Sequence, residues 1–527
     1  MRAVFVILAV PLATGVLVED LALGEARAAA VERRALPLQA KLRATVQALP
    51  KTGAGCLGPA AARYALHRVF VQKGWFVHGL QDLDPVGNAS EGSMSPVAML
   101  QDQVPEAQAV FENHLQRGGL CLRDLALLAG LLEDLVHRET MQRVSAAFKA
   151  KKVPLVGRVT VEHLASMLDY VMMSYILEVA NLEGTGLDVA ENVSVYLEGK
   201  RPMEEVYPAW PRTQKFLRDV QAVVAPARRG SLSFEEITHV VEEVQEHYGR
   251  WHDESDCLDM KNVLFGMERC PGRVDLSRFY AASLYEDRWQ FSESVTYLRD
   301  LGALDESGPA PSVVVSNYVL GASNCVGTSR FYAQCCVDPC DDLMAKLEKG
   351  LAAPAAPPAA VAAAVRAVLP STAAPSHSLE EIAHDGLVVL HGRLFAQWLH
   401  HAFPQQCPMP PLAGAKLRQE LPRDFTRRTG EDYIATDAAM RRAAGRRPED
   451  EKTRCELPWT AGEELLAGST GSQLTTSAWP VWPAWTNPTV AAAALLAAAA
   501  AVAGAWVAKR QVRAARGPLL ATEAASA

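Results

Sequence analysis

The alternation of apolar and polar positions along the chain predicts a mainly α-helical protein. Helical periodicity is expected at 61–76, at 289–301 and from 378 to about 403, where apolar residues recur every three or four positions. Runs of Val, Ile and Thr are few, and the best strand candidate is 309–320. The segment 351–377 is dense in Ala and Pro, so it is expected to be a linker or a loosely packed connection.

An internal repeat is superimposed on this pattern. Four stretches share the order Gly-x-apolar-x-apolar-x-x-apolar, and they begin at Gly118, Gly157, Gly230 and Gly272. The glycine permits a left-handed turn, the next apolar residue suits a short strand, and a polar residue can cap the following helix. The capping candidates are Thr160, Ser233 and Asp275. This order is typical of the second half of an EF-hand loop.

The spacing of these glycines predicts two EF-hand-like pairs between about 95 and 300. Gly118 and Gly157 are 39 residues apart, Gly230 and Gly272 are 42 apart, and the middle gap of 73 residues would separate the pairs. A calcium loop needs oxygen ligands at its first, third and fifth positions and a carboxylate at the twelfth. None of the four loops has this acidic cluster. We therefore expect the scaffold without ordinary calcium binding, and unrelated helix hairpins with glycine turns are the alternative.

The first residues are typical of a secretory signal peptide, expected over 1–28. A positive charge precedes the apolar run 3–18, and Ala26-Arg-Ala28 is a small-x-small cleavage motif. Cleavage nearer Glu19 and an uncleaved signal anchor are the alternatives.

The segment 489–508 is uncharged and long enough to cross a bilayer. Three tryptophans precede it and four basic residues follow it, namely Trp479, Trp482, Trp485, Lys509, Arg510, Arg513 and Arg516. This asymmetry predicts a single transmembrane helix, with the preceding residues outside the cytosol and a cytosolic tail at 509–527. The lipid bilayer is therefore one expected partner. Small residues at Ala500, Gly504 and Ala508 suit a helix-dimer face in a homodimer.

All ten cysteines precede this span, which places them in the secretory lumen or outside the cell, where disulfides form. They are Cys56, Cys121, Cys257, Cys270, Cys325, Cys335, Cys336, Cys340, Cys407 and Cys455. Two glycosylation sequons, at Asn88 and Asn192, lie on the same side. We expect a disulfide-bonded glycoprotein in which adjacent Cys335 and Cys336 pair with different partners, although the connectivity stays open.

Composition adds limits. A net charge of -8 argues against a nucleic-acid-binding surface, which needs clustered Lys and Arg. The chain of 527 residues is long enough for several cores. The expected segments are a signal peptide (1–28), a helical ectodomain with the four repeats (58–300), a cysteine-rich segment (301–350), the Ala/Pro linker (351–377), a second helical segment (378–440), a stalk (441–488), the transmembrane helix (489–508) and the tail (509–527).

One segment carries candidate chemistry. The imidazoles of His391, His400 and His401 and the thiol of Cys407 are residue types that bind copper, zinc or haem. Their spacing does not match a helical metal pair, because ligands on one helix face are three or four residues apart. A structural role therefore fits better, with His400 and His401 near a helix C-terminus. Motifs of nucleophilic enzymes, phosphate-binding loops and dinucleotide sites are absent from the sequence, so we assign no catalytic, cofactor or metal residue.

The chain also resembles an uncharacterised family of proteins from single-celled algae. The similar stretches are 62–70, 119–126, 289–294, 298–305, 323–340 and 391–407. The resemblance implies a secreted or single-pass membrane product, and it brings no known activity or site. Family sequences have Arg-Glu before the cysteine that corresponds to Cys407 and Pro-His after it. This chain has Gln405-Gln406 and Met409-Pro410 at those positions. This departure weakens the hypothesis of a metal site.

These observations predict a membrane-anchored structural or interaction protein whose ectodomain binds a protein partner. A metal- or redox-dependent enzyme that uses His391, His400, His401 and Cys407 is the first alternative. A weak calcium sensor is the second.

Overall fold

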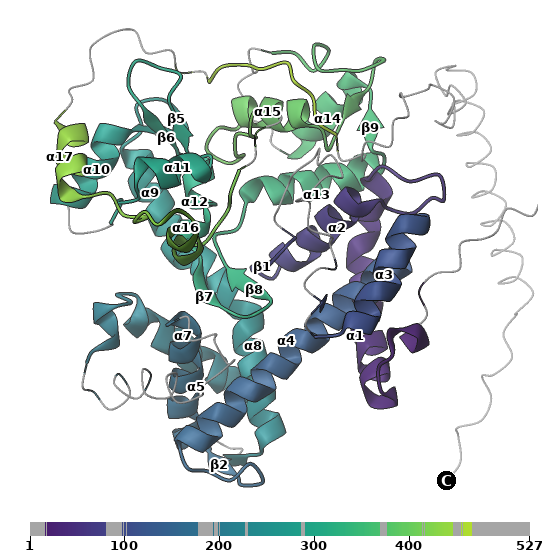
Figure 1. Cartoon of the computed structure of the whole chain (residues 1–527), viewed down its shortest axis with the longest axis vertical. Helices are drawn as coiled ribbons and strands as arrows, with labels where there is room; N and C mark the ends of the chain where they lie inside the picture. The colour runs from purple at the N-terminus through teal and green to yellow at the C-terminus, as the bar shows by residue number, and fades with distance from the viewer. Residues whose placement is uncertain are drawn as a thin grey trace, which may run out of the picture. The chain divides into compact units, whose positions relative to one another are not determined.

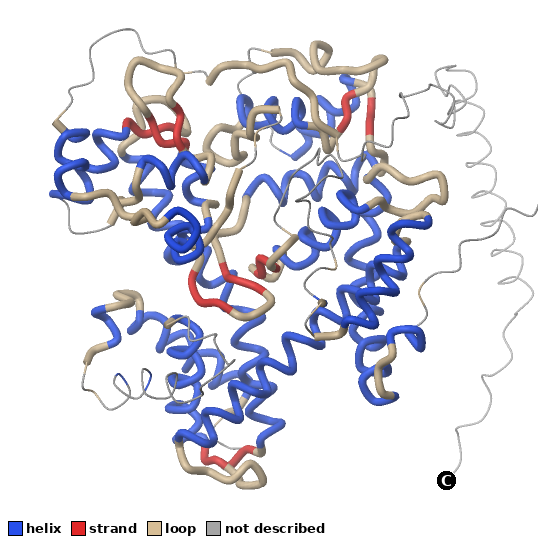
Figure 2. Tube along the Cα trace, in the orientation of Figure 1, coloured by secondary structure: helices blue, strands red, loops and turns tan. Residues whose placement is uncertain are grey.

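The computed structural model of the chain is mainly helical, with short strands (Figure 2). It describes residues 16, 18–80, 97, 100–101, 103–177, 193, 196, 199, 201–226, 230–285, 290–368, 377–413, 415, 417–445, 455 and 457–465. Its helices are arranged in what we call paired units. In units I to III, two helix hairpins meet through an antiparallel contact between the residues just before their second helices, and in unit IV one such hairpin meets the segment that precedes Arg393 in the same way.

Unit I contains α1 (Glu25–Ala48), α2 (Pro59–Val71), α3 (Pro105–Arg117) and α4 (Leu122–Ala150). Its contact is the bridge between Leu57 and Leu120, which exchange backbone hydrogen bonds of 2.8 and 2.9 Å. The helices begin where the local sequence favours it. Pro59 and Pro105 occupy first positions, and Asp124 forms a capping box with Cys121. The disulfide Cys56–Cys121 joins the same two turns.

Unit II reuses α4 as its first helix (Figure 1). It adds β2 (Val159–Thr160), α5 (Val161–Ile176), α7 (Trp210–Val224), β3 (Ser231–Leu232) and α8 (Phe234–His252). Thr160 caps α5 and Ser233 caps α8, as the sequence predicts. Strands β2 and β3 pair antiparallel, with Val159 opposite Leu232. One apolar core is continuous through units I and II.

The expected pairing of the glycine turns is therefore wrong. The turn at Gly157 is bridged to the turn at Gly230, and the turn at Gly118 to the segment before α2. The gap of 73 residues does not separate two pairs, because α5 and α7 both lie within it and pack against each other. Left-handed conformations occur at Gly119, Gly230 and Gly272, but not at Gly118 or Gly157.

Unit III follows α8 through a π-helical stretch, Asp253–Cys257. It contains α9 (Leu258–Gly266), β4 (Arg273–Asp275), α10 (Leu276–Tyr285), α11 (Val295–Asp300), β5 (Leu304–Asp305), β6 (Ser312–Val314) and α12 (Val315–Val319). Strand β6 lies between β4 and β5, with Val313 opposite Val274. Helices α16 (Pro422–Thr429) and α17 (Asp437–Ala444) contribute Phe425 and Met440 to its core.

Unit IV contains α13 (Pro339–Leu351), β9 (Ala355–Ala356), α14 (Pro358–Val368), β10 (Val388–Val389) and α15 (Arg393–Ala402). Ala356 lies opposite Val388. The Ala/Pro-rich segment 351–377 is thus not a loose linker over its described part. Val361 and Val365 are buried in the core of unit IV, and the alanines between them favour helix.

Two further connections complete the described part of the chain. Strands β1 (Trp75–Val77), β7 (Val326–Thr328) and β8 (Tyr332–Gln334) form a sheet in the order β1-β8-β7. All ten cysteines are paired, and Cys335 and Cys336 have different partners, as expected. The disulfides besides Cys56–Cys121 are Cys257–Cys336, Cys270–Cys455, Cys325–Cys335 and Cys340–Cys407.

Several predicted elements have different bounds. The helix expected at 61–76 ends at Val71, because Trp75 and Phe76 turn into β1. The helix expected at 289–301 begins only at Val295, where Ser294 caps it. In the strand candidate 309–320, only Ser312–Val314 is a strand, since Val315–Val319 forms the buried helix α12. The helix expected from 378 begins at Arg393, because turns and β10 come first.

The predicted ends are described only in part. The cleavage motif Ala26-Arg-Ala28 lies in the first turns of α1, where Arg27 pairs with Asp134. The start of the expected stalk is folded, because Cys455 is bonded to Cys270 and Leu465 is bridged to Gly392. The rest of the stalk, the span 489–508, the tail and both sequons lie outside the described residues. Among the described helices, none is long and apolar enough to cross a membrane.

Candidate functional site

A buried polar network joins units I and IV around Glu348. The carboxylate of Glu348 lies on α13 and is 1% exposed. It accepts hydrogen bonds from Thr45 Oγ1 at 2.8 Å, from Tyr64 Oη at 3.0 Å and from His391 Nε2 at 3.2 Å. These donors come from α1, from α2 and from the turn before α15. The network therefore depends on the mutual packing of both units.

Arg68 supplies the positive charge of this network. Its guanidinium is buried, pairs with the carboxylate of Asp341 and lies 4.0 Å from Glu348. Burial alone would raise the pKa of Glu348, but the hydrogen bond from His391 and the charge of Arg68 outweigh burial and lower it. Burial also raises the pKa of the Tyr64 hydroxyl well above its usual value. Glu348 is therefore an ionised acceptor, and Tyr64 is a neutral donor.

A cavity of about 240 Å³ lies beside this network. Its walls are mostly apolar, and they include the disulfide between Cys340 and Cys407. Its polar lining comes mainly from Arg63, Asp338, Asp341, His391, Arg393 and Glu464. Arg393 is held by backbone oxygens of Pro411 and Gly462, at 2.6 and 2.8 Å, and by Gln397 at 2.7 Å. The cavity has the mixed lining of a small-molecule pocket, and its described lining residues include no serine, threonine or free cysteine that could act as a nucleophile.

The four residues that the sequence singles out for metal or redox chemistry do not form a common ligand cluster in the described structure. His391 contacts Glu348, and Cys407 is oxidised in the disulfide with Cys340. The buried ring of His400 donates from Nδ1 to the carbonyl oxygen of Cys407 at 2.8 Å. Burial lowers the pKa of His400 to about 4, so the ring is neutral at pH 7. His401 packs against Trp459, with ring centroids 5.5 Å apart.

One cluster with metal-ligand chemistry occurs among the described residues, and it lies elsewhere. Ligand atoms of His252, Cys257 and Cys336 are within 4.8 Å of one another. The two sulfurs are bonded to each other, so neither is a thiolate that can bind a metal ion. His252 Nδ1 lies 3.3 Å from Asp256. This arrangement is a disulfide beside a buried histidine.

The glycine turns also use their carboxylates structurally. Asp124 and Glu236 occupy the position that provides a bidentate calcium ligand in an EF-hand loop. Asp124 instead accepts from the backbone of Cys121 at 2.9 Å and from Val16 at 2.7 Å. Glu236 accepts from the backbone of Ser233 at 2.8 Å and pairs with Arg158. Both carboxylates therefore face helix N-termini.

Sequence reasoning missed most of the network around Glu348. A usable signal exists in α2, where Arg63 and Arg68 interrupt an otherwise apolar stretch and are both buried. Charged residues in such positions are buried only when they are paired. The partners of Arg68 on α13, Asp341 and Glu348, are more than 270 residues away, and no local pattern identifies them.

Comparisons with family models, with curated proteins and with solved structures find no match to the chain. The resemblance to the algal family stays a prediction.

Proposed function

We propose that the chain is a non-enzymatic interaction protein with a disulfide-bonded helical ectodomain, anchored to a membrane by 489–508. Its ectodomain binds a protein partner, and its paired units are degenerate EF-hand-like pairs. The regular contact before the second helices supports the EF-hand-like assignment, since Leu120, Val159, Leu232 and Val274 all take part in it. The cysteine pairing supports the secretory location.

One observation carries the non-enzymatic part of this proposal. The groups that would perform metal or redox chemistry in 391–407 are committed to structural contacts. Cys407 is in a disulfide, His400 binds a backbone carbonyl, and His391 binds Glu348. A metal enzyme needs ligands that converge on one point, and these side chains do not.

Elemental analysis of the purified full-length protein tests this reading. We expect less than one equivalent of copper, zinc or iron per chain, and the same content after His400→Ala and His401→Ala. A stoichiometric metal that is lost in these variants would support the enzyme alternative and refute the proposal.

A calcium titration tests the second alternative. We expect the melting temperature to stay unchanged up to millimolar calcium, because Asp124 and Glu236 are used as helix caps. Glu236→Gln provides a matched variant. A calcium-dependent rise in melting temperature that this variant abolishes would support the sensor instead.

The membrane anchor and its orientation need a separate experiment. We expect the full chain to remain with membranes after alkaline extraction, and a chain ending at 488 to be released. Glycosidase treatment should shift the mobility of the full chain, and Asn88→Gln with Asn192→Gln should abolish the shift. Release of the full chain by alkali would refute the anchor.

A further inference from the structure

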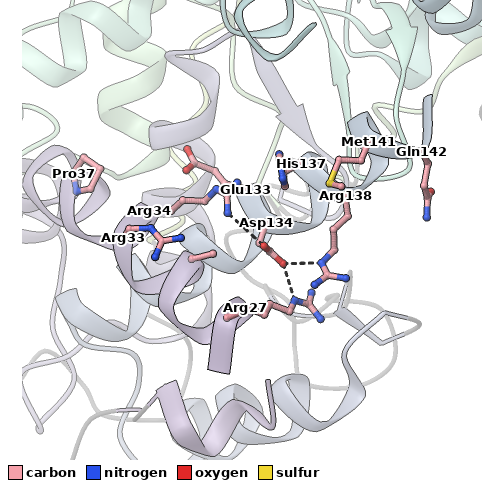
Figure 3. A pocket seen from close by; sticks show the side chains of 12 residues that line it. Arg27, Arg33, Arg34, Pro37, Glu133, Asp134, His137, Arg138, Met141 and Gln142 are labelled. Atoms are coloured by element: carbon pink, nitrogen blue, oxygen red, sulfur yellow. Dashed lines mark hydrogen bonds and ion pairs between the residues drawn. The ribbon is translucent and has the colours of Figure 1, made fainter. Parts of the chain in front are cut away.

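A groove lies between α1 and α4 in unit I (Figure 3). Its volume is about 840 Å³, which is within the usual range of ligand pockets. The two helices approach closely at Gly130, where an added Cβ would lie 2.8 Å from the carbonyl oxygen of Val31. One turn later along α4, the residues facing α1 become polar. The groove is lined by Ala26, Arg27, Ala30, Arg33, Arg34, Pro37, Glu133, Asp134, His137, Arg138, Met141 and Gln142.

Three guanidinium groups converge on a single carboxylate there. Asp134 is 5% exposed, and it lies 2.7 Å from Arg27 Nε, 3.4 Å from Arg34 Nη1 and 3.1 Å from Arg138 Nε (Figure 3). One carboxylate neutralises one of these charges. Asp134 therefore positions the three side chains and leaves an excess of positive charge.

The remaining charges in the groove do not cancel this excess. Glu133 is bound to Lys73 at 2.8 Å, and His137 contacts Glu242. Arg33 adds a fourth guanidinium to the lining. In a chain whose net charge is -8, this is a local concentration of cations.

Donor groups also remain available. A guanidinium has five N–H donors in a planar fork, and each of the three uses few of them on Asp134. Arg27 Nη2 is buried and has no hydrogen-bond partner among the described residues. An unsatisfied buried donor is costly, so an oxyanion at this position would supply the missing acceptor.

We propose that this groove binds a small ligand that carries sulfate or phosphate groups on a sugar-sized ring. The arginine forks match the geometry of tetrahedral oxyanions. The volume exceeds that of a single inorganic ion, and Ala30, Pro37 and Met141 provide apolar wall for the ring. This site is independent of the proposed interaction function, since it uses neither the cavity beside Glu348 nor 391–407.

Binding to the full-length protein in detergent tests the site by titration calorimetry. The probes are inorganic sulfate, inorganic phosphate, a sulfated disaccharide and inositol hexakisphosphate. We expect a ring-bearing probe to bind more tightly than either inorganic ion, with an affinity that falls as salt rises. Arg33→Gln combined with Arg138→Gln should weaken binding by roughly tenfold or more.

Two further variants separate the site from general charge effects. Arg123→Gln removes a charge from α4 outside the groove and should leave binding unchanged. Glu133→Gln removes a negative charge from the lining and should tighten binding, which a merely structural role would not produce. Sulfated disaccharide binding alone identifies a sulfated sugar as the ligand, and inositol phosphate binding alone identifies a phosphorylated ring.

Three results would overturn the proposal. These are no binding of either ring-bearing probe at millimolar concentration, an equal loss in Arg123→Gln, and a mature N-terminus that begins after Ala28 and so lacks Arg27. The N-terminus is determined by mass spectrometry of protein purified from cells that process the chain through their secretory pathway.

Discussion

Glu293 gives a prediction in which the pH dependence of stability changes sign relative to an ordinary carboxylate. It lies just before α11 in unit III, is 8% exposed, and accepts a hydrogen bond from Tyr318 Oη at 3.0 Å. Its second carboxylate oxygen, Oε2, is buried without a partner among the described residues. Burial raises its pKa to about 7, although the hydrogen bond from Tyr318 acts in the opposite direction.

The folded protein therefore holds a proton on Glu293 that the unfolded chain loses near pH 4.5. Between pH 4.5 and 7 the unfolded chain binds fewer protons, so the free energy of unfolding falls as pH rises. A shift from 4.5 to about 7 corresponds to about 3 kcal/mol in full, most of it lost between pH 5 and 8. Above about pH 8 the loss is complete.

Glu293→Gln removes this titration and keeps the acceptor for Tyr318. We expect the variant to exceed the wild type in stability at pH 8 by about 3 kcal/mol more than at pH 4. The assay is urea unfolding with disulfides intact, at several pH values. Glu431→Gln, an exposed change of the same charge in unit III, is the control. Tyr318→Phe removes the donor and should move the pH window upward.

Other groups titrate in the same pH range, so the prediction concerns the difference in the free energy of unfolding between each variant and the wild type. A pH-independent difference between Glu293→Gln and the wild type would refute the argument. So would an equal pH-dependent gain in Glu431→Gln.

Three further predictions concern the other buried groups. His400, with its pKa lowered to about 4 by burial, stabilises the fold above pH 6.5. This stability, about 3 kcal/mol, is lost as pH falls from 6.5 to 4. His400→Asn should abolish this dependence of the free energy of unfolding on pH, measured by urea unfolding, and an unchanged dependence would contradict the prediction. Glu348→Gln should destabilise the protein by about 3 kcal/mol or more in thermal unfolding, because Arg68 and His391 lose their buried partner. Glu205→Gln, which breaks an exposed pair, should change little, and equal effects would argue against the network. Joint Cys340→Ser and Cys407→Ser changes should cost about 4 kcal/mol, from the entropy of closing a 67-residue loop, with the same melting assay. A neutral result there would mean that the unfolded chain is already constrained.

Local chemistry was readable from the sequence alone. The helical class follows from periodicity, and the caps Thr160 and Ser233 act where their positions predict. The apolar residues Leu120, Val159, Leu232 and Val274 form the short strand contacts. These features depend on residues within one turn of each other, so a linear pattern contains the needed information.

The partners of those residues were decided only by the tertiary structure. Leu57 and Val313 complete contacts that the four-glycine repeat did not include, although Gly55-Cys-Leu57 carries part of the same pattern. The predicted linker contains helix α14, because apolar side chains of unit IV bury Val361. The tertiary structure also decides which ion pairs Arg68 and Asp134 form. Arg68 pairs with a carboxylate, and Asp134 with a guanidinium, that is distant in the sequence. A buried charge needs such a partner, but the sequence does not indicate which residue provides it.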